Sequence, residues 1–126
     1  MPASYVIDKQ KRLVVTCAWG ACTADDALEF RRQILSDSNF DPTFAQLADF
    51  TAVTTIDITP GEVRMLAWVN PFSPDSRRAI VVTNPLAFGL ARIFETLRSL
   101  RGDRHIRVFR DRQEALAWIF LKDEAA

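Results

Sequence analysis

Histidine, cysteine and glycine are scarce in this chain, and their scarcity excludes several kinds of site. The 126 residues include one histidine, two cysteines and four glycines. A structural zinc site needs four ligands, and His105 lies far along the chain from Cys17 and Cys22, so we expect two thiols and no metal site. A glycine-rich phosphate loop and a serine in a nucleophile elbow are also missing. We therefore expect no cofactor, and an enzyme is the least favoured class of function.

Long apolar runs are missing as well. No stretch approaches the roughly 18 apolar residues that a membrane-spanning helix requires, so we expect no membrane insertion. Residues 1–5 lack a basic segment followed by an apolar core, the mark of a signal peptide, and we expect a cytoplasmic protein. With 48% hydrophobic and 25% charged residues, the chain is typical of one folded domain over residues 1–126, with a flexible tail at residues 122–126.

The net charge is zero, but the charges are unevenly distributed. Between residues 77 and 112, arginines far outnumber acidic residues, which is typical either of an anion-binding face or of a solvated helix and strand edge. We do not expect nucleic-acid binding, because Phe88, Phe94 and Phe109 fall at positions that should be buried. The arginines of this segment are Arg77, Arg78, Arg92, Arg98, Arg101, Arg104, Arg107, Arg110 and Arg112.

Strand and helix patterns alternate along the sequence. Runs of β-branched and apolar residues predict strands, and a capping residue before an apolar periodic segment predicts the start of a helix. The order ββαβαβαβα predicts an α/β fold: one mixed, mostly parallel sheet of about five strands with helices on both faces. The predicted strands cover residues 5–8, 13–18, 46–51, 78–83 and 105–109, and the predicted helices begin after Thr23, Thr59, Asn84 and Asp111.

The third predicted helix, residues 85–100, carries one regular apolar stripe and one interior glycine. An interior glycine costs up to about 1 kcal/mol relative to alanine, so we expect the space at Gly89 to be needed. Close packing of the helix on the sheet would need it, and so would close approach of a ligand or partner. The stripe, which we expect to face the core, is Leu86, Leu90, Ile93, Leu97 and Leu100.

A polar segment between the strand at residues 46–51 and the second helix is expected to form a loop. Ligands of open α/β sheets bind outside the carboxyl ends of the strands, and helix N-termini attract anions. This edge is therefore a candidate regulatory or anion site, for a small acidic ligand or for a phosphate on Thr59. Alternatively, its helix-starting residues serve only as caps, each worth about 1 kcal/mol. The candidate residues are Thr54, Thr55, Asp57, Thr59, Thr83 and Asn84.

The second predicted helix is apolar on more than one side. Val63 and Leu66 share one face, whereas Met65 and Trp68 fall on another. A helix of this kind is either deeply buried or in contact with a partner, and aromatic and methionine side chains are enriched at interfaces. We therefore expect an interface or a pocket here, formed by Met65, Trp68, Phe72, Phe88 and Gly89.

Three segments together resemble the SpoIIAA-like group of STAS domains, which are related to anti-sigma-factor antagonists. They are LADF at residues 47–50, AFGLARIFE at residues 87–95, and VFRD with EALAW at residues 108–118. The resemblance extends from Tyr5 to about Phe120. In phosphorylated STAS antagonists a serine follows an aspartate at the start of the helix after the third strand. Asp57 matches that aspartate, but Ile58 occupies the serine position and Thr59 is the nearest hydroxyl, so the usual kinase switch is not expected.

These observations lead to three hypotheses about function. The first is a non-enzymatic STAS-like regulatory or protein-interaction module, dimeric or bound to a protein partner through the second helix and the loop at residues 54–59. The second is a carrier or sensor of a small anionic or apolar ligand, by analogy with the lipid-binding CRAL-TRIO proteins, whose sheets look similar. Its pocket would be lined by Trp68, Phe72, Phe88 and Phe94. The third is an enzyme using Asp57 or Asp49, the latter as a buried strand acid with a raised pKa rather than a hydrogen-bonded structural carboxylate.

Overall fold

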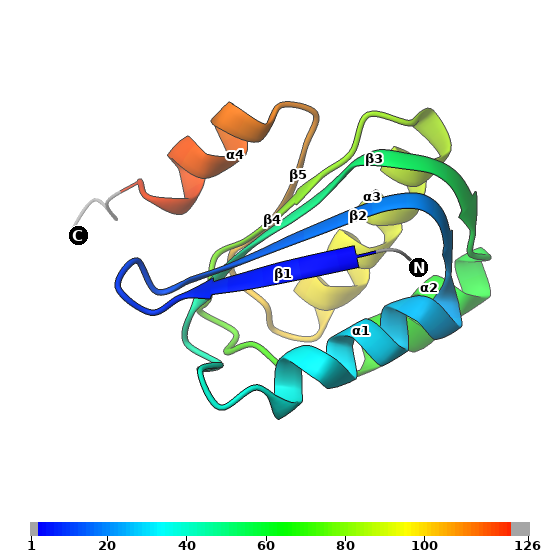
Figure 1. The fold of residues 1–126 in the computed structure, drawn as a ribbon. Helices are drawn as coiled ribbons and strands as arrows, with labels where there is room; N and C mark the ends of the chain where they lie inside the picture. Colours follow the sequence, from blue (N-terminus) through cyan, green and yellow to red (C-terminus); the bar gives the residue numbers. More distant parts are fainter. Residues whose placement is uncertain (1–2, 122–126) are drawn as a thin grey trace.

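The computed structural model describes residues 3–121, and the expected tail at 122–126 lies outside the described residues. The predicted order of strands and helices is confirmed (Figure 1). The elements are β1 (Ala3–Asp8), β2 (Leu13–Thr23), α1 (Ala24–Ser36), β3 (Ala45–Asp57), α2 (Pro60–Trp68), β4 (Arg78–Val81), α3 (Pro85–Leu100), β5 (Ile106–Phe109) and α4 (Arg112–Ile119). Within residues 3–121, no helix is both long and apolar enough to cross a membrane.

The strands form one sheet in the order β1-β2-β3-β4-β5. β1 is antiparallel to β2, and the other neighbours are parallel, as the sequence predicts. Helix α4 covers one face of the sheet, whereas α1, α2 and α3 lie on the other (Figure 1). Because side chains alternate along a strand, the same strands supply both faces. Leu47 and Val81 pack in the layer under α4, and Ala48 and Ile80 pack in the layer under α3.

Side-chain caps begin the helices where the sequence predicts. Thr23 caps α1 and Thr59 caps α2, each in a reciprocal capping box with the acidic residue three positions later, Asp26 or Glu62. Asn84 Oδ1 accepts hydrogen bonds from two backbone N–H groups of α3, and the Asp111 carboxylate does the same for α4. Local chemistry therefore fixes where the helices start.

The predicted polar loop is wrong, because β3 continues through it to Asp57. β3 pairs with β4 only as far as Asp49 and Val81, whereas its pairing with β2 continues to Asp57. Residues 50–57 therefore belong to a two-stranded ribbon with the second half of β2, which also runs longer than predicted. Alternating Thr and apolar residues are compatible with a half-exposed strand, and it is the pairing with β2 that makes this segment a strand rather than a loop.

The predicted core stripe of α3 is confirmed at Leu90 and wrong at three of its other positions. Leu86, Ile93 and Leu100 are exposed, and the residues that face the core are Ala87, Leu90 and, at the C-terminal end, Arg98. The helix is rotated because alanines allow it to approach the sheet and because Arg98 has a buried partner. Gly89 consequently lies on the outer side of α3, where an added Cβ would meet nothing within 4 Å, so close packing does not explain this glycine.

Candidate functional site

A cavity of about 200 Å³ lies between the sheet and the three helices on its covered face. Its floor consists of alternate residues of three neighbouring strands, and several of these are small. Thr16 and Ala18 come from β2, Ala48 from β3, Ile80 from β4, and Val82 from the position just after β4. Small side chains in the middle of the sheet leave space that the helices cannot fill. Most space between elements in a protein interior is filled, so an opening of this size is unusual.

The helices supply a mainly apolar roof over this cavity. The lining from the helix layer includes Ala27 and Phe30 of α1, Val63 and Leu66 of α2, and Ala87, Leu90, Ala91 and Phe94 of α3. The ribbon of β2 and β3 closes one end with Cys22, Phe50 and Ile56. The cavity is partly open to solvent, so a ligand has a way in.

The opposite end of the cavity is polar, and Arg78 dominates it. Gln46 and Arg78 pair at the beginnings of β3 and β4, and both line the cavity. Arg78 is only 8% exposed. Its Nη1 donates to Asn70 Oδ1 at 2.9 Å, and its Nε donates to Gln46 Oε1 at 3.3 Å. Nη2 donates no hydrogen bond to any of the described residues, which leaves one side of a buried guanidinium for another acceptor.

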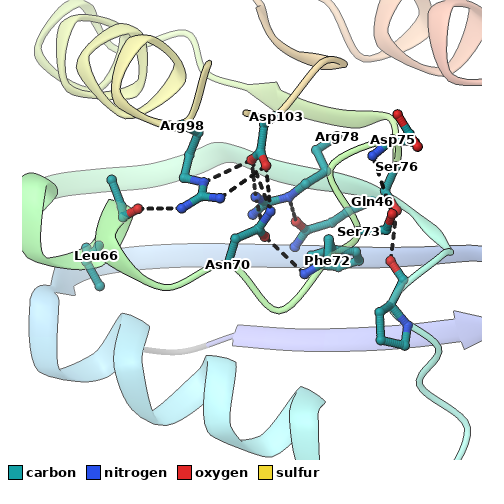
Figure 2. A network of polar contacts seen from close by, with 12 residues as sticks. Gln46, Leu66, Asn70, Phe72, Ser73, Asp75, Ser76, Arg78, Arg98 and Asp103 are labelled. Carbon is teal, nitrogen blue, oxygen red and sulfur yellow. Dashed lines mark hydrogen bonds and ion pairs between the residues drawn. The ribbon is translucent and has the colours of Figure 1, made fainter. Parts of the chain in front are cut away.

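Asp103 is the carboxylate of the polar network at this end (Figure 2). Arg98 Nε and Nη2 donate to its two oxygens at 2.9 and 3.1 Å, and Arg98 Nη1 donates to the Ala67 carbonyl. Asn70 Nδ2 also donates to Asp103. The Arg78 Nη1 atom lies farther from Asp103, at 3.8 Å. Arg98 therefore takes the close, two-pronged contact, and Arg78 holds the weaker ion pair.

Arg31 of α1 adds a further positive charge to this end of the cavity. It lines the cavity, and its Nη2 donates to the Leu66 carbonyl at 2.7 Å. Burial, followed by repulsion from Arg98, lowers the pKa of Arg31. Burial lowers the pKa of Arg78 to about 10, and the attraction of Asp103 opposes this change. Arg78 and Arg98 therefore share the single carboxylate of Asp103, and Arg31 adds a third guanidinium group nearby.

The expectation of a solvated arginine surface is therefore wrong for two of the arginines between residues 77 and 112. Arg78 and Arg98 are buried. Arg78 also lies against two aromatic rings, with its Cζ 4.8 Å from the centre of Phe72 and 5.6 Å from that of Phe94. These rings stabilise the charge and hold the guanidinium plane at the cavity wall.

The predicted anion site at the carboxyl ends of the strands is not assembled as a pocket. None of its six residues lines the cavity, and the exposed residues Thr54, Thr55 and Asp57 lie on the β2–β3 ribbon rather than on a loop. Thr59 Oγ1 and Glu62 already satisfy each other's backbone N–H groups, and a carboxylate at this helix N-terminus disfavours a further anion. Asn84 occupies the N-terminus of α3 in the same way, and Thr83 is exposed beside it.

The predicted interface and pocket residues divide into two groups. Phe72 and Phe94 line the cavity, as the second hypothesis requires. Trp68 is 67% exposed, Met65 is exposed beside it on α2, and neither contacts the cavity. Phe88 packs against the apolar layer under α3, and the Arg110 guanidinium lies 4.2 Å from its ring centre.

Asp49 is a structural carboxylate rather than a poised acid. Thr51 donates to it from its backbone N–H and its hydroxyl, and Arg112 Nη1 donates at 2.6 Å. Burial alone would raise the pKa of Asp49, but these bonds outweigh it and hold the pKa below its ordinary value. Of the two alternatives for Asp49, the structure has the hydrogen-bonded structural carboxylate and not the acid with a raised pKa. Among residues 3–121, no three His, Cys, Asp or Glu side chains lie close enough together to hold a metal ion.

Sequence reasoning missed the polar residues of the cavity, namely Thr16, Arg31, Gln46 and Arg78. One signal was present: Arg78 begins the most apolar strand and shares the alternation of Ile80 and Val82. An arginine two residues before a buried isoleucine on a central strand must point into the same layer.

Comparison with protein-family models and with curated proteins gave no match. Among solved structures, the crystal structure of an uncharacterised protein of the DUF3478 family with a SpoIIAA-like fold, from Shewanella loihica, is similar to this chain. The TM-score is 0.59, the sequence identity is 18%, and the match covers 93% of each chain. The protein therefore has a SpoIIAA-like fold, as the sequence predicts, and at this identity the likeness concerns the fold alone.

Proposed function

We propose that this protein is a non-enzymatic binding module that holds a small, largely apolar molecule in the cavity between the sheet and α1–α3. The observation that supports this proposal is the cavity of about 200 Å³ with apolar walls on every helix that covers it. Among the described residues that line it, no side chain is a carboxylate or a histidine, the usual groups of acid–base catalysis. Binding without chemistry is the function that this lining favours.

The volume sets the size of the ligand. An engineered apolar cavity of about 150 Å³ binds benzene, and drug-sized ligands occupy pockets of about 300–1,000 Å³. A cavity of about 200 Å³ therefore suits a single aromatic ring or a short alkyl chain, and it is too small for a lipid with two acyl chains. Each buried CH₂ group contributes about 0.8 kcal/mol before the costs of association, so a neutral ligand of this size binds weakly.

The test is to fill the cavity with a side chain and measure binding of a neutral probe. Ala91 lines the roof from α3, and Ala91→Leu would occupy part of the space while keeping a good helix former. We expect 1-octanol to bind the unchanged protein at one site in isothermal titration calorimetry, and Ala91→Leu to weaken binding about tenfold or more.

The matched control is Ala117→Leu, an exposed alanine of α4 on the opposite face of the sheet. This variant should bind 1-octanol like the unchanged protein. Failure of 1-octanol to bind at all, or an equal loss of binding in both variants, would contradict the proposal.

A second candidate function is protein contact through the outer side of α2 and α3. Met65, Trp68 and Val69 of the α2 end and Leu86, Ile93 and Leu100 of α3 are exposed, and we call these residues the outer apolar strip. The Arg101 guanidinium lies 3.8 Å from the Trp68 ring centre, which connects the two parts of the strip near the end of α3. Exposed apolar residues gathered in this way are typical of interaction surfaces.

A further inference from the structure

We propose that the ligand of the cavity is a small amphipathic anion, a monocarboxylate whose head group is bound by Arg78 and Arg31 and whose apolar tail lies along the floor. This inference rests on the proposed binding function and names the chemical class of its ligand.

The cavity has two chemically different ends, and strand register defines them. Gln46 and Arg78 are paired neighbours at the beginnings of β3 and β4. Val82 lies just beyond the other end of β4, and Ile56 lies near the end of β3. A ligand that spans the floor therefore meets hydrogen-bond donors at one end and only apolar or thiol side chains at the other. A neutral apolar molecule would leave the donors without an acceptor.

The positive charge at the polar end is only partly compensated. Arg98 forms the close two-pronged ion pair with Asp103, and Arg78 is 3.8 Å from the same carboxylate. Arg31 forms no ion pair with any carboxylate of the described chain, and it is repelled by the charge of Arg98. Burying an excess of positive charge is costly, so a bound anion would stabilise this arrangement.

Arg78 and Arg31 each have N–H groups that donate to none of the described residues. Arg78 uses Nε and Nη1 for Gln46 and Asn70, which leaves Nη2. Arg31 Nη2 donates to the Leu66 carbonyl, whereas Arg31 Nε and Nη1 donate to none of the described residues. Two guanidinium groups with donors to spare, both lining one cavity, fit the two oxygens of a carboxylate. Gln46 lines the same end and adds polar surface, and Thr16 follows in the floor, in register with Ala48 and Ile80.

The experiment compares octanoate, 1-octanol and octylamine, which share an alkyl chain and differ in charge. In calorimetric titrations at neutral pH, we expect octanoate to bind at least about tenfold more tightly than 1-octanol, because a hydrogen bond to a charged group contributes more than a neutral one. Octylamine should bind most weakly, because its ammonium group meets two arginines.

The variants test whether Arg31 recognises the charge. Arg31→Met should remove the preference for octanoate, measured as the ratio of octanoate affinity to 1-octanol affinity in the same variant. Arg31→Gln is the second variant, because its amide can still donate to the Leu66 carbonyl while the charge is lost. Arg32→Met is the matched control: Arg32 is the exposed neighbour on the same helix and is paired with Glu29, and its loss should change nothing. Circular dichroism checks that each variant is folded.

The outcomes separate this inference from the function on which it rests. If 1-octanol binds as tightly as octanoate, or if both Arg31 variants keep the full preference for octanoate, the anionic ligand is wrong while the binding function stands. If neither compound binds, both proposals are wrong.

Discussion

Arg78 carries a positive charge that is buried inside the protein. Asn70, Gln46 and two aromatic rings hold its guanidinium, and the pKa of about 10 leaves it protonated at neutral pH. A lysine at this position would carry the charge on one compact group and would lack the planar fork that donates to the carboxamide oxygens of Asn70 and Gln46. The identity of this residue therefore matters beyond its charge.

Asp49 gives a prediction about pH. Its pKa is lower in the folded protein than in the unfolded chain, so its ionised form stabilises the fold above the unfolded value, near pH 4, and the contribution is lost as the pH falls through the folded pKa. Asp49→Asn should lower the free energy of unfolding by about 1 kcal/mol at pH 7. The difference from the unchanged protein should shrink between about pH 5 and pH 3, as measured by urea denaturation.

Asp57→Asn is the control for this measurement, because Asp57 is an exposed carboxylate on the same strand. It should change the free energy of unfolding by less than about 0.5 kcal/mol at either pH. A difference between Asp49→Asn and the unchanged protein that stays constant with pH would show that the ionised carboxylate of Asp49 does not stabilise the fold.

At the scale of single elements, we expect alanine substitutions at two glycines in and after α3 to change the stability of the protein in opposite directions. Gly89 lies inside the helix with open space around it, so Gly89→Ala should stabilise the protein by up to about 1 kcal/mol. Gly102 follows the helix with φ +105°, where alanine is strained, so Gly102→Ala should destabilise it by about 1 kcal/mol or more. Thermal and urea denaturation measure both changes. If Gly89→Ala is destabilising instead, the outer side of α3 is occupied in solution.

The elements also show which features the sequence can predict. Helix starts were predictable because a cap depends on residues within one turn, as with Thr23 and Asp26 or Thr59 and Glu62. The length of β3 could not be predicted from the sequence, because residues 50–57 form a strand through pairing with β2 rather than through their own residue pattern. The predicted core face of α3 was wrong at most positions, because the apolar residues have the period of a helix and therefore looked like a core stripe. Only the tertiary contact of Arg98 with Asp103 reveals that the helix is rotated.

At the scale of the whole molecule, the outer apolar strip predicts association. Six exposed apolar side chains on neighbouring helices cost solubility unless something covers them. We expect the protein to be dimeric at micromolar concentration in sedimentation velocity and the double variant Trp68→Glu with Leu100→Glu to be monomeric. Phe120→Glu, an exposed aromatic just after α4 on the other face, should leave association unchanged. If the unsubstituted protein is monomeric even at high concentration, this prediction is wrong.

The SpoIIAA-like fold was predictable from the sequence, whereas its cavity was not. Alternating strands and helices determine the layers, and the match to a solved SpoIIAA-like structure has the same layers. A cavity is made by what side chains leave empty, and this one depends on small residues of separate strands, including Thr16 and Ala48, meeting beneath three helices. Each of these residues alone looks like ordinary strand sequence.

The ribbon of β2 and β3 has a further consequence for how such a cavity changes size. Between Cys17 and Trp19, and again between Gly20 and Ala21, β3 contains one more residue than β2. Extra residues on one strand bend a ribbon, and this one curves toward α2 (Figure 1). Because the bend carries Ile56 and Cys22 to the end of the cavity, backbone length at the bulges sets the depth of that end. Gain or loss of a bulge residue would therefore change the length of the cavity, and with it the length of the ligand proposed above, while the arginines at the other end stay where they are.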